Sequence, residues 1–428
     1  MDLIADLKAR GLIAQMTGDG ELEAHLNACR RKVYSGFDPT ADSLHIGSLV
    51  PLLALRRFQL AGHAPIALVG GATGLVGDPS FKAAERQLNT VDVVAEWVEC
   101  IRRQMEHFID FDSGKTSATL VNNLDWMGSM DVLTFLRDVG KHFSVNAMIQ
   151  KESVKQRIER EGSGISFTEF SYMILQSYDF AELNRRYGCT LQIGGSDQWG
   201  NITGGIDLTR RLNSSQVFGL TLPLVTKSDG TKFGKTESGT VWLDAAKTSP
   251  YSFYQFWMNT ADSDVYRFLR FFTLLPVAEL EELEFADRER SGRPEAQSVL
   301  AREVTRLVHG EQGLGAAQRI SEALFSGYID SLSENDFEQL RLDGMPGSML
   351  ADGEADEPLT SLFTECGLAK NGKQVKDALQ RRAVSVNGAE LGWEDNMLKA
   401  EIFSQEKSRY GKYFLVKLGK KSYHLFWF

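Results

Sequence analysis

The chain has 428 residues, of which 43% are hydrophobic and 24% are charged. This length is too great for one ordinary hydrophobic core, so we expect two or three domains, and the composition is typical of a globular protein. No run of eighteen apolar residues occurs, so no membrane span is expected, and the first residues lack the basic-then-apolar layout of a secretory signal.

The net charge of −10 is unevenly distributed. Residues 365–428 hold twelve Lys or Arg against seven Asp or Glu, a balance of +5, so the remainder carries −15. On charge alone two interpretations stay open, an ordinary solvated surface or a basic appendage that binds a polyanion. Cys29, Cys100, Cys189 and Cys366 are scattered without metal-binding spacing, which indicates a reduced, cytoplasmic setting.

Strands and helices alternate in the first half of the chain. Residues 32–36 and 64–71 are short, nearly continuous apolar runs, typical of buried parallel strands, and residues 90–109 have the apolar spacing of a helix. Residues 118–123 and 189–194 are two further predicted strands. This alternation predicts an α/β fold with a Rossmann-like parallel sheet.

The remaining segments have different patterns. Residues 115–187 are longer than one crossover needs, so we predict a largely helical insertion, and residues 249–327 are predicted to be helical throughout. Residues 343–358 are rich in Gly, Pro and acidic residues, which is typical of a linker. After them the sequence predicts two short helices, a strand and a turn at Asn387-Gly388. The predicted division is therefore a Rossmann-like domain over 1–240, an α-helical domain over 241–342, a linker over 343–358 and a small α+β domain over 359–428.

A histidine followed by Ile-Gly stands where a helix is about to begin, in "FDPTADSLHIGSLVP", residues 37–51. In an open parallel sheet, ligands bind where strand carboxyl ends meet helix N-termini, and such N-termini attract phosphate. His45 can donate a hydrogen bond to a phosphate oxygen there, and Gly47 allows a base or ribose to approach the backbone. A lone histidine is more often structural, so this stretch does not decide the function by itself.

Two later loops support a nucleotide site. The loop "KSDGTKFGKTESG", residues 227–239, has three glycines and three lysines, of which Lys232 and Lys235 can reach phosphate charge; an ordinary exposed turn is the alternative. The stretch "GGSDQWGN", residues 194–201, follows a predicted strand. Asp197 is placed there to accept hydrogen bonds from ribose hydroxyls, or else to cap a helix.

Two more stretches indicate a lined pocket. The run "GGATGLVGDP", residues 70–79, is neither a Walker loop nor a clean dinucleotide fingerprint, so its glycines favour close substrate approach with Asp78 as a charged group at the rim. Tyr172, Gln176 and Asp179 share one face of a predicted helix. Because apolar residues surround them, they are better interpreted as a pocket lining than as an ordinary polar helix face.

Together these stretches resemble a known family. His45-Ile46-Gly47-Ser48 and Lys232-Phe233-Gly234-Lys235-Thr236 are similar to the HIGH and KMSKS signatures of class I aminoacyl-tRNA synthetases. "YSGFDPTADSLHIGSLVPLL", "LVGGATGLVGDPSFKAAER", "SYMILQSYDF" and "GGSDQWGN" resemble bacterial tyrosyl-tRNA synthetases over almost the whole chain. The tail from about residue 359 resembles the small RNA-binding module that ends those enzymes.

The resemblance implies a role for each matching residue. The residues that act on the triphosphate and the leaving pyrophosphate are Thr40, His45, Lys82, Arg86, Lys232 and Lys235. The residues that bind tyrosine are Tyr34, Asp78, Tyr172, Gln176, Asp179 and Gln198, with Tyr34 and Asp179 at the phenol. The residues on the nucleotide side are Ser35, Asp38, Gly47, Ser48, Gly195, Asp197 and Lys235. Arg210 and Arg211 match basic residues that contact the acceptor end of tRNA.

Two positions depart from the family pattern. Ser48 stands where the first signature often has a second histidine, and Ser35 stands where many relatives have cysteine. Both positions neighbour the nucleotide in the family. Since a hydroxyl still forms hydrogen bonds, we expect retained activity with altered ATP contacts.

The resemblance implies a tyrosine–tRNA ligase that activates L-tyrosine with ATP and transfers the tyrosyl group to the 3′ end of tRNA(Tyr). It implies Mg²⁺ travelling with ATP and no dedicated metal site, a homodimer with its interface in residues 115–187, a cytoplasmic location and no membrane partner. Three alternatives stay open. A related nucleotidyltransferase would not need the basic tail, and a tryptophanyl enzyme should lack the Tyr34–Asp179 pair. The third is an RNA-binding protein without catalysis. The intact Thr40, His45 and loop lysines argue against the last.

Overall fold

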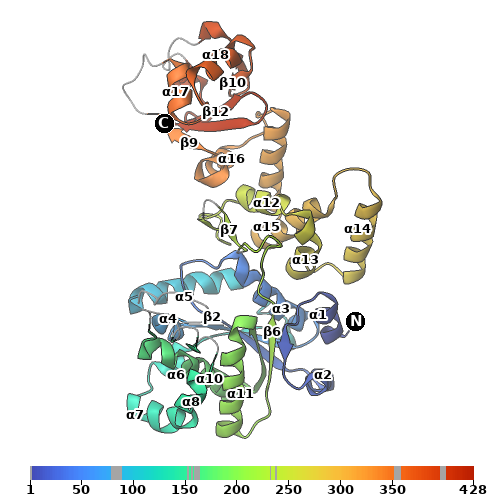
Figure 1. Ribbon diagram of the computed structural model, residues 1–428, viewed down its shortest axis with the longest axis vertical. Helices are drawn as coiled ribbons and strands as arrows, with labels where there is room; N and C mark the ends of the chain where they lie inside the picture. The colour runs from blue at the N-terminus through green and yellow to red at the C-terminus, as the bar shows by residue number, and fades with distance from the viewer. Residues whose placement is uncertain are drawn as a thin grey trace. The chain divides into compact units, whose positions relative to one another are not determined.

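The computed structural model describes residues 2–78, 89–151, 154–155, 158, 164–231, 233–236, 239–350, 358–395 and 402–428. They form two compact units. One comprises Met1–Leu243 with Thr260–Leu300, and the other comprises Asp244–Asn259 with Ala301–Phe428 (Figure 1). The predicted helical domain, residues 241–342, is therefore divided between the two units.

A six-stranded sheet forms the centre of the first unit, in the order β1-β6-β5-β2-β3-β4. Its strands are β1 (Gln15–Met16), β2 (Lys32–Phe37), β3 (Ala64–Val69), β4 (Thr119–Asn122), β5 (Cys189–Gly195) and β6 (Phe218–Leu222). Every pair is parallel except β1 with β6. All residues of β3 are buried, as expected for a parallel strand covered on both faces. The predicted α/β parallel sheet is confirmed.

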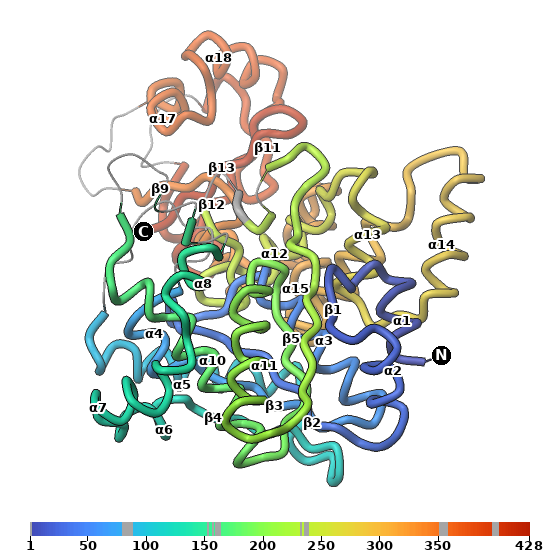
Figure 2. The backbone as a smooth tube through the Cα atoms, turned by 60° about the horizontal axis from the view of Figure 1, so that its bottom comes forward, coloured from blue at the N-terminus to red at the C-terminus, as the bar shows by residue number. Residues whose placement is uncertain are grey.

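Helices cover both faces of this sheet. The helices of the first unit are α1 (Leu3–Ala9), α2 (Asp19–Ala28), α3 (Leu49–Leu60), α4 (Thr73–Val76), α5 (Val91–Met105), α6 (Leu124–Met127), α7 (Val132–Thr134), α8 (Val145–Ile149), α10 (Phe167–Tyr187), α11 (Trp199–Asn213), α13 (Asp262–Phe272) and α14 (Val277–Glu289). Helices α3 and α5 lie on one face, and α10 and α11 lie on the other (Figure 1). Figure 2 shows α10 and α11 side by side.

The strand order places a crevice between β2 and β5. From β2 the chain proceeds outward through β3 and β4 on one side, and the later strands β5 and β6 continue on the other. A parallel sheet binds its ligands outside the carboxyl ends of the strands where this direction reverses. Tyr34 of β2 and Gln192 of β5 are register partners beside this point.

Helix α10 has clear start and stop signals. The side chain of Ser166 accepts a hydrogen bond from the Glu169 N–H and so caps the N-terminus. Gly188 follows the last residue with φ +67°, the left-handed conformation in which helices commonly end. The segment 115–187, predicted to be largely helical, begins with strand β4 and then contains α6, α7, α8, the short π-helix Phe135–Val139 and α10.

The second unit contains a five-stranded sheet in the order β11-β10-β12-β13-β9. Its strands are β9 (Gly347–Met349), β10 (Val384–Val386), β11 (Ala389–Leu391), β12 (Tyr413–Leu418) and β13 (Ser422–Trp427), and its helices are α12 (Pro250–Met258), α16 (Glu334–Gln339), α17 (Leu359–Glu365) and α18 (Gly372–Gln380). Helix α15 (Ala296–Ser326) spans both units and is interrupted at Gly310. The separate sheet agrees with the predicted α+β domain at the end of the chain.

Part of the predicted linker, residues 343–358, belongs to this sheet. Strand β9 pairs in parallel with β13, and the Leu350 N–H donates to the carbonyl oxygen of Trp427 at 2.7 Å. A Cβ on Gly347 would come within 2.6 Å of the Trp427 ring. A strand of three residues at a sheet edge is too short to leave a periodic signal, so composition alone indicated a linker. Residues 351–357 lie outside the described residues.

Candidate functional site

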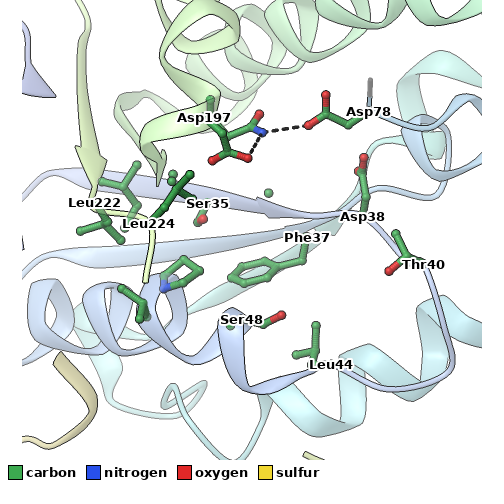
Figure 3. A pocket seen from close by; sticks show the side chains of 18 of the residues that line it. Ser35, Phe37, Asp38, Thr40, Leu44, Ser48, Asp78, Asp197, Leu222 and Leu224 are labelled. Carbon is green, nitrogen blue, oxygen red and sulfur yellow. Dashed lines mark hydrogen bonds between the residues drawn. The ribbon is translucent and has the colours of Figure 1, made fainter. Parts of the chain in front are cut away.

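One cavity of about 660 Å³ opens at the carboxyl ends of β2 and β5. It brings together most of the residues singled out in the sequence, and all of them belong to the first unit. These residues are Tyr34, Ser35, Asp38, Thr40, His45, Gly47, Ser48, Asp78, Tyr172, Gln176, Asp179, Gly195, Asp197 and Gln198. Figure 3 shows Asp197 and Asp78 on one side of this cavity and Leu44 and Ser48 on the opposite side.

Six other predicted residues are not part of this described lining. Lys82, Arg86 and Lys232 lie outside the described residues, and Lys235 is described only through its backbone in the short strand β7 (Lys235–Thr236). Arg210 and Arg211 lie on α11 and pair with Asp207, at 2.6 and 2.8 Å between nitrogen and oxygen. Arg211 lines a separate cavity of about 380 Å³, which also includes Lys141 and Lys151.

A donor and an acceptor meet at the buried end of the cavity. The Tyr34 side chain is 1% exposed, and its hydroxyl has no hydrogen-bond partner among the described residues. Asp179 is 2% exposed and accepts hydrogen bonds from Asn123 Nδ2 at 3.0 Å and Trp126 Nε1 at 2.8 Å. A buried polar group without a partner costs free energy. An unpartnered hydroxyl that lines a cavity therefore points to a ligand with a matching polar atom.

Burial controls the protonation of this pair. It raises the pKa of Asp179 to about 8, against the hydrogen bonds from Asn123 and Trp126, which lower it. Burial also raises the pKa of Tyr34 well above its usual value, and the nearby Asp179 carboxyl adds to the effect. Tyr34 therefore remains a hydroxyl donor at neutral pH. Asp179 accepts through oxygens that Asn123 and Trp126 already orient.

A chain of hydrogen bonds continues from Asp179 along the cavity wall. Asn123 Nδ2 also donates to Thr73 Oγ1 at 2.9 Å, and Thr73 Oγ1 donates to Asp38 Oδ1 at 2.6 Å. The Tyr172 hydroxyl donates to the other Asp38 oxygen at 2.6 Å. Asn123, Trp126 and Thr73 were not among the predicted site residues. The available signal was the pair of asparagines at the end of β4, Asn122 and Asn123, and nothing in that pattern specifies a partner 56 residues away.

A second polar cluster lies where β5 meets α11. Gln198 Nε2 donates to Asp78 Oδ2 at 2.8 Å and to Asp197 Oδ2 at 3.2 Å (Figure 3). Asn201 Nδ2 donates to the amide oxygens of Gln198 and Gln176, both at 3.1 Å. Burial raises the pKa of Asp197, and the Asp78 carboxyl adds to this. Two carboxylates and several amides thus face one another, which suits a ligand that carries both a cation and hydroxyl groups.

The start of α3 forms the opposite wall. His45 precedes the 3-10 turn Ile46–Ser48, and its Nδ1 accepts a hydrogen bond from the Gly47 N–H at 3.0 Å. A neutral ring that accepts at Nδ1 carries its proton on Nε2, so Nε2 is the atom that can donate to a ligand. A Cβ on Gly47 would come within 2.8 Å of the His45 ring. The glycine is therefore needed for this ring position as well as for ligand approach.

The two signature stretches are connected through their backbones. The Ile46 N–H donates to the Val241 carbonyl at 3.0 Å, and the Leu243 N–H donates to the Leu44 carbonyl at 2.9 Å. Gly234 has φ +79°, and a Cβ there would come within 2.6 Å of the Ile46 side chain. The chain that follows the lysine loop is thus fixed against the histidine signature.

Comparison with known proteins agrees with this geometry. Residues 27–326 match the family model of tRNA synthetases class I (W and Y), and residues 336–426 match that of the tyrosine–tRNA ligase SYY-like C-terminal domain. The tyrosine–tRNA ligase of Aliivibrio fischeri (strain MJ11) is 64% identical over 425 residues, covering 99% of this chain and 98% of its own. The chain belongs to the tyrosine–tRNA ligase family. The corresponding ligase of Neisseria meningitidis serogroup C is 58% identical, covering 99% of each chain.

Solved structures of synthetases share the fold of this tyrosine–tRNA ligase. A C-terminally truncated mitochondrial tyrosyl-tRNA synthetase from Aspergillus nidulans superposes with a TM-score of 0.68 at 30% identity, covering 76% of this chain and 94% of its own. A tryptophanyl-tRNA synthetase from Encephalitozoon cuniculi, at 13% identity and a TM-score of 0.53, shares the fold alone. Family membership confirms the resemblance that the motifs indicate. No described helix of the ligase is both long enough and apolar enough to cross a membrane.

The close packing of Gly70 against Asp38 generates a first prediction. A Cβ on Gly70 would come within 2.0 Å of Asp38 Oδ1 and 2.3 Å of Thr73 Oγ1. Gly70→Ala should therefore displace the Asp38–Thr73 hydrogen bond and lower the free energy of unfolding by about 1–3 kcal/mol, measured by urea denaturation. Gly20→Ala is the control, because a Cβ in that exposed helical position meets nothing within 4 Å. Equal stability of the two variants would contradict the proposed crowding.

Proposed function

We propose that this tyrosine–tRNA ligase activates L-tyrosine with ATP in the cavity between β2 and β5, and then transfers the tyrosyl group to the 3′ end of tRNA(Tyr). The observation that carries this assignment is the buried pair at the end of the cavity, the Tyr34 hydroxyl and the Asp179 carboxyl. A phenol both donates and accepts hydrogen bonds. It therefore satisfies the Asp179 acceptor and the Tyr34 donor at the same time.

The polar groups along the cavity fit the remaining parts of the two substrates. We assign the amino group of tyrosine to Asp78, Tyr172 and Gln176, and its carboxylate to Gln198. Asp197 accepts from the ribose hydroxyls, while Ser35, Asp38, Gly47, Ser48 and Gly195 lie along the nucleotide. Thr40, His45, Lys82, Arg86, Lys232 and Lys235 act on the phosphates. The described members of this set line one cavity, apart from Lys235, and that proximity supports the assignment.

Activation requires positioning and charge stabilisation rather than a covalent partner on the protein. A carboxylate oxygen of tyrosine attacks the α-phosphorus of ATP, and the bond to the oxygen that bridges the α- and β-phosphates breaks. Diphosphate leaves with that electron pair. His45 Nε2 and the Thr40 hydroxyl are donors that can stabilise the charge that develops on the phosphate oxygens.

Magnesium enters this scheme as part of the nucleotide substrate. The described residues include no group of three or more His, Cys, Asp or Glu side chains placed to hold a metal ion. Enzymes of this kind use ATP with Mg²⁺, and a hard cation with few protein ligands is typically bound through substrate phosphates. We assign no resident metal to the protein.

We propose that transfer to tRNA uses surfaces outside the cavity. The terminal ribose hydroxyl of tRNA takes the tyrosyl group from the adenylate, and AMP leaves. Arg210 and Arg211 are exposed enough to contact the acceptor end, and the basic domain over residues 359–428 is assigned to RNA binding.

A homodimer is supported by the exposed apolar side chains of the helical insertion, which are Val132, Leu133, Leu136, Val145 and Phe167. We also assign the enzyme to the cytoplasm, since none of its four cysteines forms a disulfide.

Tryptophan is the second candidate substrate, because a tryptophanyl enzyme shares the fold. The indole N–H can donate to Asp179, but an indole has no acceptor for the Tyr34 hydroxyl. That hydroxyl would stay buried and unpaired, which costs binding free energy. The cavity end therefore favours tyrosine.

The activation step can be tested directly. We expect ATP–pyrophosphate exchange with tyrosine in the presence of Mg²⁺, and none above background with tryptophan or leucine. All twenty amino acids should be assayed with the full chain. Absence of exchange with tyrosine would refute the proposed function.

The phenol pair can be tested by comparing tyrosine with phenylalanine. Tyr34→Phe should cost about 0.5–1.5 kcal/mol in kcat/KM for tyrosine, the value of a neutral hydrogen bond. Asp179→Asn should cost about 1–3 kcal/mol, because the new amide nitrogen cannot accept a hydrogen bond and leaves a buried donor, Asn123 or Trp126, unpaired. Neither variant should lower kcat/KM for phenylalanine as much, since that substrate has no hydroxyl to lose. If the ratio of the two substrates is unchanged in both variants, specificity resides elsewhere.

The basic domain can be tested without removing it. Truncation near residue 350 would expose a core shared by α15, α16, β12 and β13, so charge reversal is the cleaner change. Lys373 and Arg381 are exposed at α18. Reversing both to Glu should weaken tRNA charging while adenylate formation stays unchanged. The slope of the logarithm of the tRNA binding constant against the logarithm of the salt concentration should become shallower by about 1 for each lost phosphate contact. Lys115→Glu, on the first unit, is the control, and an equal loss there would contradict the assignment.

A further inference from the structure

We propose that three residues of helix α13, Asp264, Arg267 and Phe268, are positioning residues for the activation step. They fix Thr226 and the parts of the lysine loop that follow it, residues 227–231 and 233–236, beside the cavity. This inference rests on the proposed function, because it assumes that the loop lysines act on the phosphates of ATP. It adds residues that lie outside the cavity and that no sequence motif indicated.

The first attachment point is the carboxylate of Asp264. The Ser228 N–H donates to its two oxygens at 3.0 and 3.2 Å, and Ser228 Oγ donates to Oδ2 at 3.1 Å. Arg267 Nη2 donates to Asp264 Oδ1 at 2.6 Å and also to the Thr226 carbonyl. The Asp264 side chain is only 3% exposed. Hydrogen bonds to a buried, charged acceptor are the strong ones, so this end of the loop is firmly held.

The second attachment point is aromatic. The Phe233 ring lies 5.0 Å from the Phe268 ring in an edge-on arrangement and 5.2 Å from the Phe272 ring in a stacked one. Offset and edge-to-face pairs at this spacing are favourable beyond the burial of their area. Phe233 is the residue between Lys232 and Gly234 in the second signature. Both Thr226 and Phe233 line the cavity, so α13 holds the loop at two points that touch the site.

Helix α13 is itself fixed at its other end. Arg57 Nη2 donates to the carbonyls of Thr273, Phe271 and Arg270, at 2.7, 3.2 and 3.3 Å, and Arg10 Nη2 donates to the Leu275 carbonyl at 2.7 Å. Cations at a helix C-terminus satisfy free carbonyls and interact favourably with the helix dipole. Arg57 is buried and belongs to α3, the helix that begins directly after the histidine signature. Contacts between helices α3 and α13 thus connect the histidine signature with the lysine loop.

This connection has a specific consequence for catalysis. The loop contains Gly230, Gly234 and Gly239, all with positive φ, and a glycine-rich segment loses much conformational entropy when it is ordered. Contacts with α13 order it before the substrates arrive. The loop lysines act on the phosphates, whereas Tyr34 and Asp179 bind the phenol through β2 and α10. Loosening the loop should therefore slow adenylate formation and leave tyrosine affinity nearly unchanged.

The experiment compares Asp264→Ala with wild type in the full chain. We expect the single-turnover rate of tyrosyl-adenylate formation to fall by about tenfold to a hundredfold, the range that corresponds to lost hydrogen bonds to a charged group. The Kd for tyrosine, from equilibrium dialysis without ATP, should change less than about twofold. Ser228→Ala should cause a smaller loss. Because both changes remove the same contact, the losses in the double variant should be less than additive.

Arg270→Ala is the matched control. Its side chain lies on the same helix and pairs with Glu284 at 2.8 Å, so it reports on α13 packing without removing a described hydrogen bond to the loop. We expect wild-type adenylate formation from this variant at equal thermal stability. If Asp264→Ala does not fold, Asp264→Asn tests the contact with Ser228, and Phe268→Leu tests the contact with Phe233. Equal losses in rate and tyrosine affinity, full additivity, or an equal rate loss in Arg270→Ala would overturn the inference. Lack of exchange by the wild type would instead refute the proposed function.

Discussion

The buried carboxyl group of Asp179 is the constraint on which the site depends. A carboxyl group at 2% exposure is costly unless its oxygens are hydrogen-bonded, and Asn123 and Trp126 each donate to one of them. Asn123 then binds Thr73, and Thr73 binds Asp38. The position of Asp179 is thus linked by hydrogen bonds along the cavity wall to Asp38, which we propose to lie beside the nucleotide. A change in any of these four partners alters more than its own contact, because partly satisfied polar networks are unstable.

The connection between the two signatures follows from the sheet topology. Strand β2 ends at Phe37, several residues before the histidine signature, and β6 ends at Leu222, several residues before the lysine loop. Because the two strands lie in one parallel sheet, both end at the same edge of it. Beyond that edge, the Ile46 N–H donates to the Val241 carbonyl and the Leu243 N–H donates to the Leu44 carbonyl, so the two segments of chain pair with each other. The groups that we propose to act on the phosphates come from distant parts of the sequence and are held together by backbone pairing, which side-chain variation such as Ser48 does not disturb.

The sequence predicted features that leave a local pattern. Buried parallel strands are apolar runs, and Tyr172, Gln176 and Asp179 repeat at helical spacing, so both could be recognised. The partners of Asp179 could not, because Asn123 and Trp126 approach it only through the packing of β4 against α10. The antiparallel edge strand β1 and the edge strand β9 have two and three residues, too few for a period to appear. Likewise, nothing near Asp264 indicates its contact with Ser228, which depends on the tertiary packing of α13.

One end of the cavity is formed by regular secondary structure and the other by a loop, and this difference has a physical reason. The end that we propose to bind the phenol lies on β2 and α10, where regular structure fixes the donor and acceptor, as discrimination by a single hydroxyl requires. The end that we propose to bind the phosphates uses a glycine-rich loop beside the start of α3. A loop lets its charges follow the phosphates as they change shape during the reaction, but it lowers the rate if it is left unordered. Attachment at Ser228 and Phe233 limits that disorder, and Gly230 and Gly234 supply the positive φ that the path of the chain requires there. Substrate specificity and reaction rate are thus assigned to separate structural elements, so a change in one element leaves the contacts of the other in place.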